Sequence, residues 1–553
     1  MLSTRSVLTA HSFRLIQFCA LAACALVAGW AGDAQARGVA GCTDSWKSAT
    51  SGAWANPAAW STGKIPVSTD SVCITAPGTY TVTLTPYAAG NGDIVASLTL
   101  GASSGRQTLA ILGQSSVSSS NEVQNTTALQ LLGTGSVSSS GEIVLDATGG
   151  GTRTQGGALG GIAVLISGKV LTNLGRIVTR VEDKAWQTYF SGQLLNEHSG
   201  TVTVSTGTLS LPSPSTSGFG SANGFAITNE GGSFTVSRGA SFVMEAGIGA
   251  SGSFTNAGTV INDGTLVGGV SGGPMTWTQH SGSVRGKPVV LQNGAWLADL
   301  AGPGQFLFDD ASGALTGTVP AGQTITVRGE PYSYQGENYN GTALNLENPQ
   351  SNAPAVINRG TVVLDSPGKG TTSGGPASLA HGSLVNHGTI VTTVEDSSWT
   401  NALQVRLVNV HSGRIEVKSG VLNQNAVATT TNQGVVTVSP GAQWGLNEGG
   451  AFVNKPNGTI TLQISGTRRF GSFVLTNPCC QAAGKLTASG TLSPKLIHGY
   501  KPRANTTFKL FLLEGGQFAG TFRHIGKGFA GDYSHESAGY AGATYGAAGK
   551  KKP

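Results

Sequence analysis

The sequence has little charge, few aromatic residues and almost no methionine. Of its 553 residues, 11% are charged, 7% are aromatic and 3 are Met. The exposed faces of coiled coils and helical bundles need Lys and Glu, so this composition argues against both classes. The 33 basic residues barely outnumber the 27 acidic ones. They do not cluster as a nucleic-acid-binding surface requires, except at Lys550–Lys552, which is predicted to be a frayed chain end.

Glycine and short alternating runs are abundant. The chain holds 83 Gly, and 39% of its residues are hydrophobic. Valine, isoleucine and threonine recur in segments such as TVTV and TITL, which is the alternation of half-buried strands. A disordered polymer would lack these residues. The sequence therefore predicts an all-β fold punctuated by glycine.

The first 36 residues have the order of an export signal. Two arginines precede an apolar run over residues 15–32, and Ala34-Gln35-Ala36 follows as a cleavage site. An uncleaved membrane anchor and a lipoprotein modified at Cys24 are the alternatives. We predict cleavage after Ala36 and a secreted or cell-surface protein.

Cleavage would leave four cysteines, Cys42, Cys73, Cys479 and Cys480, which allow three pairings. In an oxidising compartment we favour a Cys42–Cys73 disulfide. The adjacent Cys479 and Cys480 could form a vicinal disulfide or stay as free thiols, and the sequence does not decide between the two. No cysteine spacing is typical of zinc sites, so we predict no metal and no cofactor.

The chain contains a large internal duplication. Residues 171–209 and 384–422 share 18 identities in 39 positions at a constant offset of 213. Weaker matches extend this to two copies, 105–262 and 321–464. We predict an N-terminal cap and first coils over 37–104, connecting coils over 263–320, a closing β segment over 465–525 and a flexible basic tail over 526–553.

A shorter period lies inside each copy. An Asn, a short spacer, a Gly and a β-branched run return every 22–33 residues. The asparagines are Asn173, Asn196, Asn229, Asn256, Asn358, Asn386, Asn409, Asn432 and Asn454. Asn and Gly tolerate tight turns, and one turn with two or three strands per period forms one coil of a solenoid. Aligned Asn side chains can then form a hydrogen-bonded ladder. We predict a right-handed parallel β-helix rather than a string of β-sandwiches, which needs frequent hairpins.

Both ends of the mature chain resemble a known group of proteins. The run W-x-x-P-x-x-W-x-x-G-x-x-P-x-x-x-D from Trp54 to Asp70 resembles the opening of many secreted bacterial β-helix proteins, including autotransporter passengers and adhesin-like surface proteins. The segment from Leu486 is similar to their closing β unit. The resemblance implies a capped β-helix that acts at a surface, although no membrane barrel is expected after Pro553.

Some polysaccharide lyases and hydrolases also use β-helices, so we searched for clustered carboxylates. Glu182-Asp183 and Glu395-Asp396 recur in both copies, each followed by Trp186 or Trp399, and Asp309-Asp310 stands alone. Recurrence in both copies favours a packed turn over a single active site, and a duplicated sugar subsite is the functional alternative.

Two histidines occupy the repeated sequence N-x-H-S-G. Because histidine is one of the few non-glycine residues found at positive φ, His198 and His411 are predicted to be turn residues.

The leading hypothesis is an exported, non-catalytic, monomeric β-solenoid that acts as a surface or matrix protein through adhesion or contact with polysaccharide or the cell envelope. Trp186, Tyr189 and Trp399 are its predicted exposed contact residues. The alternative is a secreted polysaccharide-degrading enzyme. A third possibility is envelope attachment through the tail at Lys550–Pro553.

Overall fold

The computed structural model describes residues 41–85, 93–117, 122–148, 162–181, 187–211, 224–246, 250–270, 273–309, 312–329, 331–334, 337–346, 355–367, 375–395, 399–425, 428–477 and 482–546. The chain divides at Asp44, and the unit that begins there holds all the strands found in the described residues. The predicted signal peptide, residues 1–36, lies outside the described residues.

The N-terminal strands and the first copy follow one another along the chain. The N-terminal elements are β1 (Asp44–Ser45), β2 (Gly52–Ala53), η1 (Pro57–Ala59), β3 (Ser71–Ile74), β4 (Tyr80–Leu84), β5 (Asp93–Val95) and β6 (Ser97–Leu100). The first copy contains β7 (Gln107–Val117), β8 (Glu122–Leu131), β9 (Gly135–Val137), β10 (Gly141–Thr148), β11 (Ile162–Asn173), β12 (Arg176–Val181) and β13 (Gln187–Asn196). It continues through β14 (Thr201–Val204), β15 (Thr208–Leu211), β16 (Phe225–Asn229), β17 (Ser233–Val236), β18 (Ser241–Met244), β19 (Gly252–Asn256) and β20 (Thr259–Asn262).

Strands also fill the segment between the copies. They are β21 (Thr265–Gly268), β22 (Met275–Gln279), β23 (Ser283–Gly286), β24 (Val289–Leu291), β25 (Trp296–Ala298), β26 (Gly304–Phe308), β27 (Ser312–Leu315) and β28 (Thr318–Val319). β21 pairs in parallel with β18 before it and β24 after it, so the stack of coils continues through residues 263–320.

The second copy repeats the pattern. It contains β29 (Gln323–Arg328), β30 (Pro331–Tyr334), β31 (Glu337–Asn340), β32 (Thr342–Leu346), β33 (Val356–Asn358), β34 (Thr361–Ser366), β35 (Ala377–Asn386) and β36 (Thr389–Val394). It continues through β37 (Thr400–Asn409), β38 (Arg414–Val417), β39 (Val421–Gln424), β40 (Thr429–Asn432), β41 (Val435–Val438), β42 (Gln443–Leu446), β43 (Ala451–Asn454) and β44 (Thr459–Gly466). β30 and β31 form an antiparallel hairpin outside the main sheet.

The C-terminal elements are β45 (Arg469–Phe470), β46 (Ser472–Thr476), β47 (Lys485–Ala488), β48 (Thr491–Leu496), β49 (Thr507–Glu514), β50 (Gln517–Gly520), β51 (His524–Ile525), β52 (Phe529–Asp532), η2 (Glu536–Ala538) and β53 (Tyr540–Tyr545).

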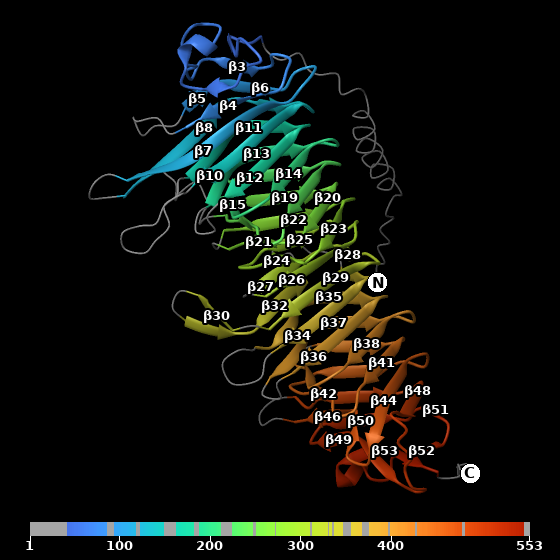
Figure 1. Ribbon diagram of the computed structural model, residues 1–553. Coiled ribbons are helices and arrows are strands. Elements are labelled where there is room, and N and C mark those ends of the chain that lie inside the picture. Colours follow the sequence, from blue (N-terminus) through green and yellow to red (C-terminus); the bar gives the residue numbers. More distant parts are fainter. Residues whose placement is uncertain are drawn as a thin grey trace, which may run out of the picture. The chain divides into compact units, whose positions relative to one another are not determined.

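Most strands pair in parallel with strands one coil earlier and one coil later. β14, for example, lies between β12 and β17, and β17 pairs onward with β20. Figure 1 shows the coils following one another in chain order from blue to red. Because neighbouring coils satisfy each other's backbone N–H and C=O groups, a single coil would be unstable alone. The predicted all-β parallel solenoid is confirmed.

Alternation along each strand builds one continuous apolar interior. In β14, Val202 and Val204 are buried while Thr201 and Thr203 face outward. Aromatic side chains stack from coil to coil inside, as in the pair Phe254–Trp277, whose ring centroids are 4.3 Å apart. Apolar interior stacking therefore supports the same register that the backbone pairs define.

The C-terminal end differs from its prediction. Residues 526–553 are expected to be a flexible tail, but β53 pairs antiparallel with both β49 and β52, and Ala541 and Ala543 are fully buried. Small side chains allow this close packing: a Cβ on Gly542 would lie 2.0 Å from the carbonyl oxygen of Phe508. The flexible-tail prediction is wrong up to Tyr545. Residues 547–553 lie outside the described part.

The N-terminal end is closed by tryptophans. The Trp60 indole N–H donates to the Trp54 carbonyl at 2.7 Å, and the two rings meet edge to face. Nearby, Asp44 is fully buried and its carboxylate accepts four hydrogen bonds from Ser45, Ser61 and Thr62. Cys42 and Cys73 form a disulfide, as predicted. Cys479 and Cys480 lie outside the described residues.

Candidate functional site

The nine repeat asparagines lie inside the solenoid at the ends of strands. Each is at most 1% exposed. In the first copy, Asn173 Nδ2 donates to Asn196 Oδ1 at 2.7 Å, and the chain of bonds continues through Asn229 and Asn256 to Gln279. All bonds run in one direction, from each side chain to the next coil. The amide dipoles therefore reinforce one another along the ladder.

The second copy contains an equivalent ladder. Asn358, Asn386, Asn409, Asn432 and Asn454 are joined by four bonds of 2.7–2.8 Å. The four donating asparagines each use their second N–H on a backbone carbonyl of the next coil. Both donors of these buried amides are therefore satisfied, which burial requires.

The turn after each asparagine has a different physical basis from the one predicted. His198 and His411 lie in turns, as predicted, but neither is among the described residues with positive φ, so the physical reason given for their choice is wrong. The residue that follows each histidine holds the turn instead. Ser199 Oγ donates to the Leu174 carbonyl at 2.7 Å, back to the preceding coil. Glycine is needed for close approach, since a Cβ on Gly200 would lie 2.2 Å from the Asn173 carbonyl oxygen.

A shallow groove lies outside the first ladder, on the face formed by β12, β14 and β17. Its volume is about 470 Å³. Thr201 and Thr203 on β14 are in register with Ser233 and Thr235 on β17. The four hydroxyl side chains point outward because Val202, Val204, Phe234 and Val236 fill the interior. Adjacent coils lie ~4.8 Å apart, so the groove presents donors and acceptors at a regular spacing.

One end of this groove carries charge. Arg176 lines it, one coil before Thr201. The Arg176 Nε atom lies 3.4 Å from a Glu142 carboxylate oxygen, and Thr108 also donates to Glu142. This partial pairing holds the guanidinium in place while 44% of the Arg176 side chain stays exposed. The remaining N–H groups can therefore reach a ligand in the groove.

The predicted aromatic contacts lie elsewhere. Tyr189 and Trp399 are half-buried rather than exposed as predicted. The Tyr189 hydroxyl accepts a hydrogen bond from Gln187. Burial raises the pKa of the Tyr189 phenol; the Gln187 bond lowers this pKa in part, and the charge of nearby Glu245 raises it. Trp186 lies outside the described residues. As contact residues, all three stay predictions.

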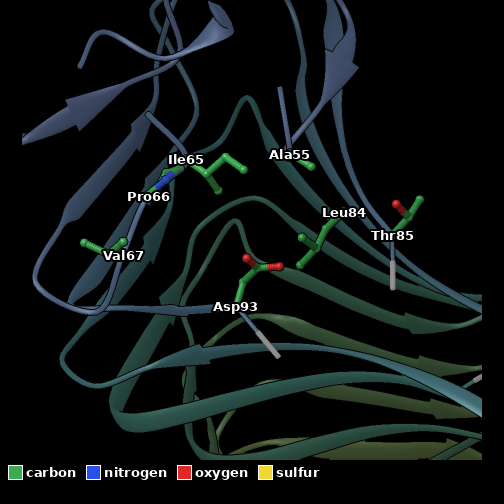
Figure 2. Close-up of a pocket in the computed structure, with 7 residues that line it drawn as sticks. All are labelled: Ala55, Ile65, Pro66, Val67, Leu84, Thr85 and Asp93. Carbon is green, nitrogen blue, oxygen red and sulfur yellow. The ribbon is translucent and has the colours of Figure 1, made fainter. Parts of the chain in front are cut away.

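A second cavity of about 220 Å³ lies at the N-terminal end of the solenoid (Figure 2). It is lined by Ala55, Ile65, Pro66, Val67, Leu84, Thr85 and Asp93. Figure 2 shows the Asp93 carboxyl pointing between Ile65 and Leu84. Burial raises the pKa of Asp93, and the nearby Trp54 indole, which lies outside good hydrogen-bonding geometry, lowers it in part.

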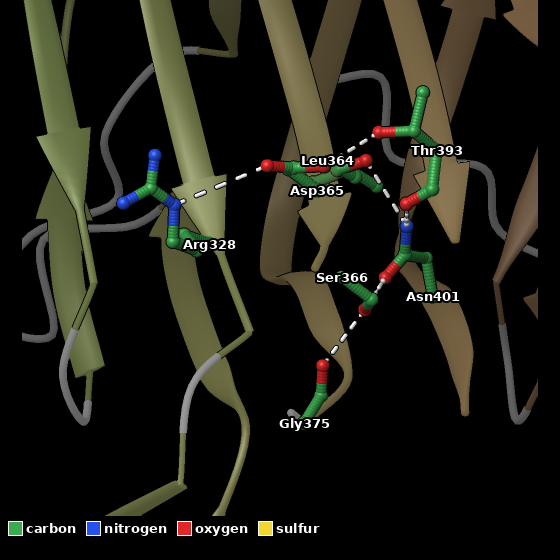
Figure 3. Close-up of polar contacts among 7 residues, drawn as sticks. All are labelled: Arg328, Leu364, Asp365, Ser366, Gly375, Thr393 and Asn401. Carbon is green, nitrogen blue, oxygen red and sulfur yellow. Dashed lines mark hydrogen bonds and ion pairs between the residues drawn. The ribbon is translucent and has the colours of Figure 1, made fainter. Parts of the chain in front are cut away.

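Three charged side chains stand in consecutive coils around the start of the second copy. Asp309 directly follows β26. Arg328 ends β29 and Asp365 lies on β34, as Figure 3 shows. The Arg328 Nε atom is 3.9 Å from Asp365 Oδ2, and Thr393 donates to Asp365 Oδ1 at 2.7 Å. Burial raises the pKa of Asp309, while Gln292 and the Arg328 charge lower it. Asp310, Glu182, Asp183 and Asp396 lie outside the described residues, and Glu395 is exposed.

The charged row is backed by a buried polar cluster. Asn401 Nδ2 donates to Thr392 Oγ1 and to the carbonyls of Leu364 and Thr393, at 2.8–3.0 Å. Asn401 Oδ1 accepts from Ser366 Oγ at 2.6 Å (Figure 3). Such a satisfied network fixes the backbone under Asp365. Sequence inspection missed it because the partners come from three separate strands.

Among the described residues, no group of three His, Cys, Asp or Glu side chains is placed to hold a metal ion. Nor does that part of the chain include a helix long and apolar enough to span a membrane.

The chain has a weak structural likeness to a protein of known structure. No family model and no curated protein matches the chain. The match is to a crystal structure of a TibC-catalyzed hyper-glycosylated fragment of TibA. It covers 72% of the present chain and 100% of the TibA fragment, at 16% sequence identity and a TM-score of 0.24. At this score the likeness carries no weight, and the solenoid assignment stands on the strand pairing described above.

Proposed function

We propose that the protein is an exported surface or matrix protein that contacts polysaccharide along the groove between Arg176 and Thr235. The observation that carries the proposal is the in-register set of four hydroxyl side chains on β14 and β17. A shallow site with donors repeated at the coil spacing suits a repeating polymer better than a compact small molecule, which favours deep apolar pockets.

Export is supported by two features. Residues 1–36 have the sequence of a signal peptide, and the Cys42–Cys73 disulfide is typical of an oxidising compartment. We propose cleavage after Ala36 and action outside the cell. N-terminal sequencing of the exported protein tests the cleavage position.

Binding to insoluble polysaccharides tests the groove. We expect the protein to sediment with at least one member of a panel of neutral and acidic polysaccharides. Replacement of both Thr203 and Thr235 by Val should weaken binding about 10-fold, because each exchange removes a hydroxyl at nearly constant volume. Thr437→Val is the matched control, since Thr437 also faces outward from a parallel strand but lies outside the groove. Equal losses in both variants would contradict the proposal.

A second candidate function is polysaccharide cleavage, favoured by the row of Asp309, Arg328 and Asp365. The two carboxyl-bearing residues are two coils apart, roughly 10 Å between Cα atoms, near the range of about 6.5–9.5 Å between carboxyl groups of inverting glycosidases. Release of reducing ends by the protein, abolished in Asp309→Asn and Asp365→Asn, would establish this function and overturn the non-catalytic proposal.

Two proposals come from the sequence alone. Trp186, Tyr189 and Trp399 are proposed as additional contacts, to be tested by alanine variants in the same sedimentation assay. Attachment to the cell envelope through Lys550–Pro553 is tested by deletion of those residues, with release into the medium as the expected result.

A further inference from the structure

We propose that the N-terminal cavity around Asp93 binds an aliphatic primary ammonium group, with the carboxylate holding the charge and the apolar wall holding the carbon stem. This site is separate from the groove on β14 and β17, and its proposal does not depend on polysaccharide binding.

The first argument is the uncompensated charge of Asp93. Among the described residues, Asp93 has no ion-pair partner, and the cavity lining contains no Lys or Arg. A half-buried carboxylate without a cation carries a desolvation cost, which the nearby Trp54 indole offsets only in part. An ammonium ligand would supply both the missing charge and hydrogen-bond donors.

The second argument is the shape and chemistry of the wall. Ile65, Pro66, Val67 and Leu84 line the cavity with aliphatic surface. Val67 is 57% exposed at the rim, although it is a large hydrophobic residue. Such a wall suits methylene groups, whereas a sugar would leave its hydroxyl groups facing surface that cannot bond them.

The third argument is size. The cavity of about 220 Å³ exceeds the ~150 Å³ that accommodates benzene in an engineered core, and it is smaller than the ~300 Å³ at which drug-sized sites begin. One short alkyl chain with a terminal ammonium therefore fits, either as a free amine or as the end of a lysine side chain.

Calorimetric titration of the whole protein with n-butylammonium tests the site, and 1-butanol serves as the neutral ligand of similar shape. We expect saturable binding with a dissociation constant on the order of 1 mM for five non-hydrogen atoms. Butanol should bind at least about 10-fold more weakly, because it cannot form the charge-assisted bond. Equal binding of the two ligands, or no saturable heat with either, would overturn the proposal.

Three variants complete the test. Asp93→Asn should weaken n-butylammonium binding about 10-fold or more, while Glu230→Gln, which removes an exposed charge elsewhere, should leave it unchanged. Ala55→Leu should fill the cavity and abolish binding with Asp93 still present. Melting temperatures no lower than that of the wild-type protein show that the variants are folded. Unaltered affinity in folded Asp93→Asn would refute the site.

A peptide ligand distinguishes the two sources of the ammonium group. Nα-acetyl-lysine amide carries the same group on a four-carbon stem. Tighter binding of this compound than of n-butylammonium assigns the cavity to a lysine side chain of a partner protein, and weaker binding assigns it to a free amine.

Discussion

Replacement of Asn409 by Asp should turn the second asparagine ladder into a pH-sensitive defect. Asn409 is fully buried, accepts from Asn386 at 2.8 Å and donates to Asn432 Oδ1 at 2.7 Å and to the Val435 carbonyl at 3.5 Å. The aspartate keeps the acceptor but replaces the donor with a second oxygen. Two buried acceptors lose their N–H, at about 1–3 kcal/mol each. We expect a loss of about 3 kcal/mol at pH 7.

The pH dependence has a definite sign. Burial among acceptors favours the neutral acid, so the folded-state pKa of the carboxyl group introduced by Asn409→Asp should lie above its unfolded value of about 3.9. Below that unfolded value the carboxylic acid is neutral in both states and its O–H can donate to Asn432. As pH rises toward the folded-state pKa, the variant should lose stability relative to the wild-type protein.

Urea unfolding followed by tryptophan fluorescence at pH 4.0 and pH 7.0 measures both effects. Asn477→Asp is the control, because Asn477 is exposed and outside the ladder. Asn409→Ala should also be destabilised, without the pH dependence. A free energy of unfolding for Asn409→Asp within about 0.5 kcal/mol of wild type at both pH values would refute the view that the ladder is buried and obligatory.

Three further predictions concern other parts of the fold. Gly413→Ala should destabilise the protein by more than about 2 kcal/mol in the same urea assay, because its Cβ would lie 2.3 Å from the Asn386 carbonyl oxygen. Reduction of the Cys42–Cys73 disulfide, which spans 73 − 42 = 31 positions, should cost about 3–4 kcal/mol and lower the melting temperature. Burial raises the pKa of Glu245, so Glu245→Gln should raise the melting temperature at pH 7 but not at pH 4, where the acid is already neutral.

Much of the coil architecture is predictable from the sequence because one side chain repeats with the coil. Asn196 and Asn229 each precede a glycine and a strand, so their spacing predicts the coil boundaries. The hydroxyl face is also encoded, since TVTV at 201 and SFTV at 233 place Thr and Ser on the outward side of a strand. This signal is local, and alternation alone determines it.

Features assembled from distant segments were not predictable. The Asp93 cavity combines a loop at Ile65–Val67 with strands β4 and β5, and no short motif relates these residues. The prediction for the C-terminal segment is wrong for a different reason. Alanine and glycine in β53 are typical of a flexible tail, yet small side chains are also what a strand needs to lie against Phe508. Composition cannot separate the two cases, because the difference lies in the partner surface.

The ladder and the groove are physically one structure. Asn173 Nδ2 donates to the Thr201 carbonyl at 3.2 Å, and Asn196 Nδ2 donates to the Ser233 carbonyl at 3.2 Å. Thr201 and Ser233 begin the two strands that present the hydroxyl groups. Each buried amide therefore fixes the starting point of a strand, and a slip of one residue would turn its hydroxyl side chains into the apolar interior. The spacing of the outer hydroxyl groups is thus determined by side chains that never meet solvent, so a substitution at these asparagines would also alter the hydroxyl surface in front of them.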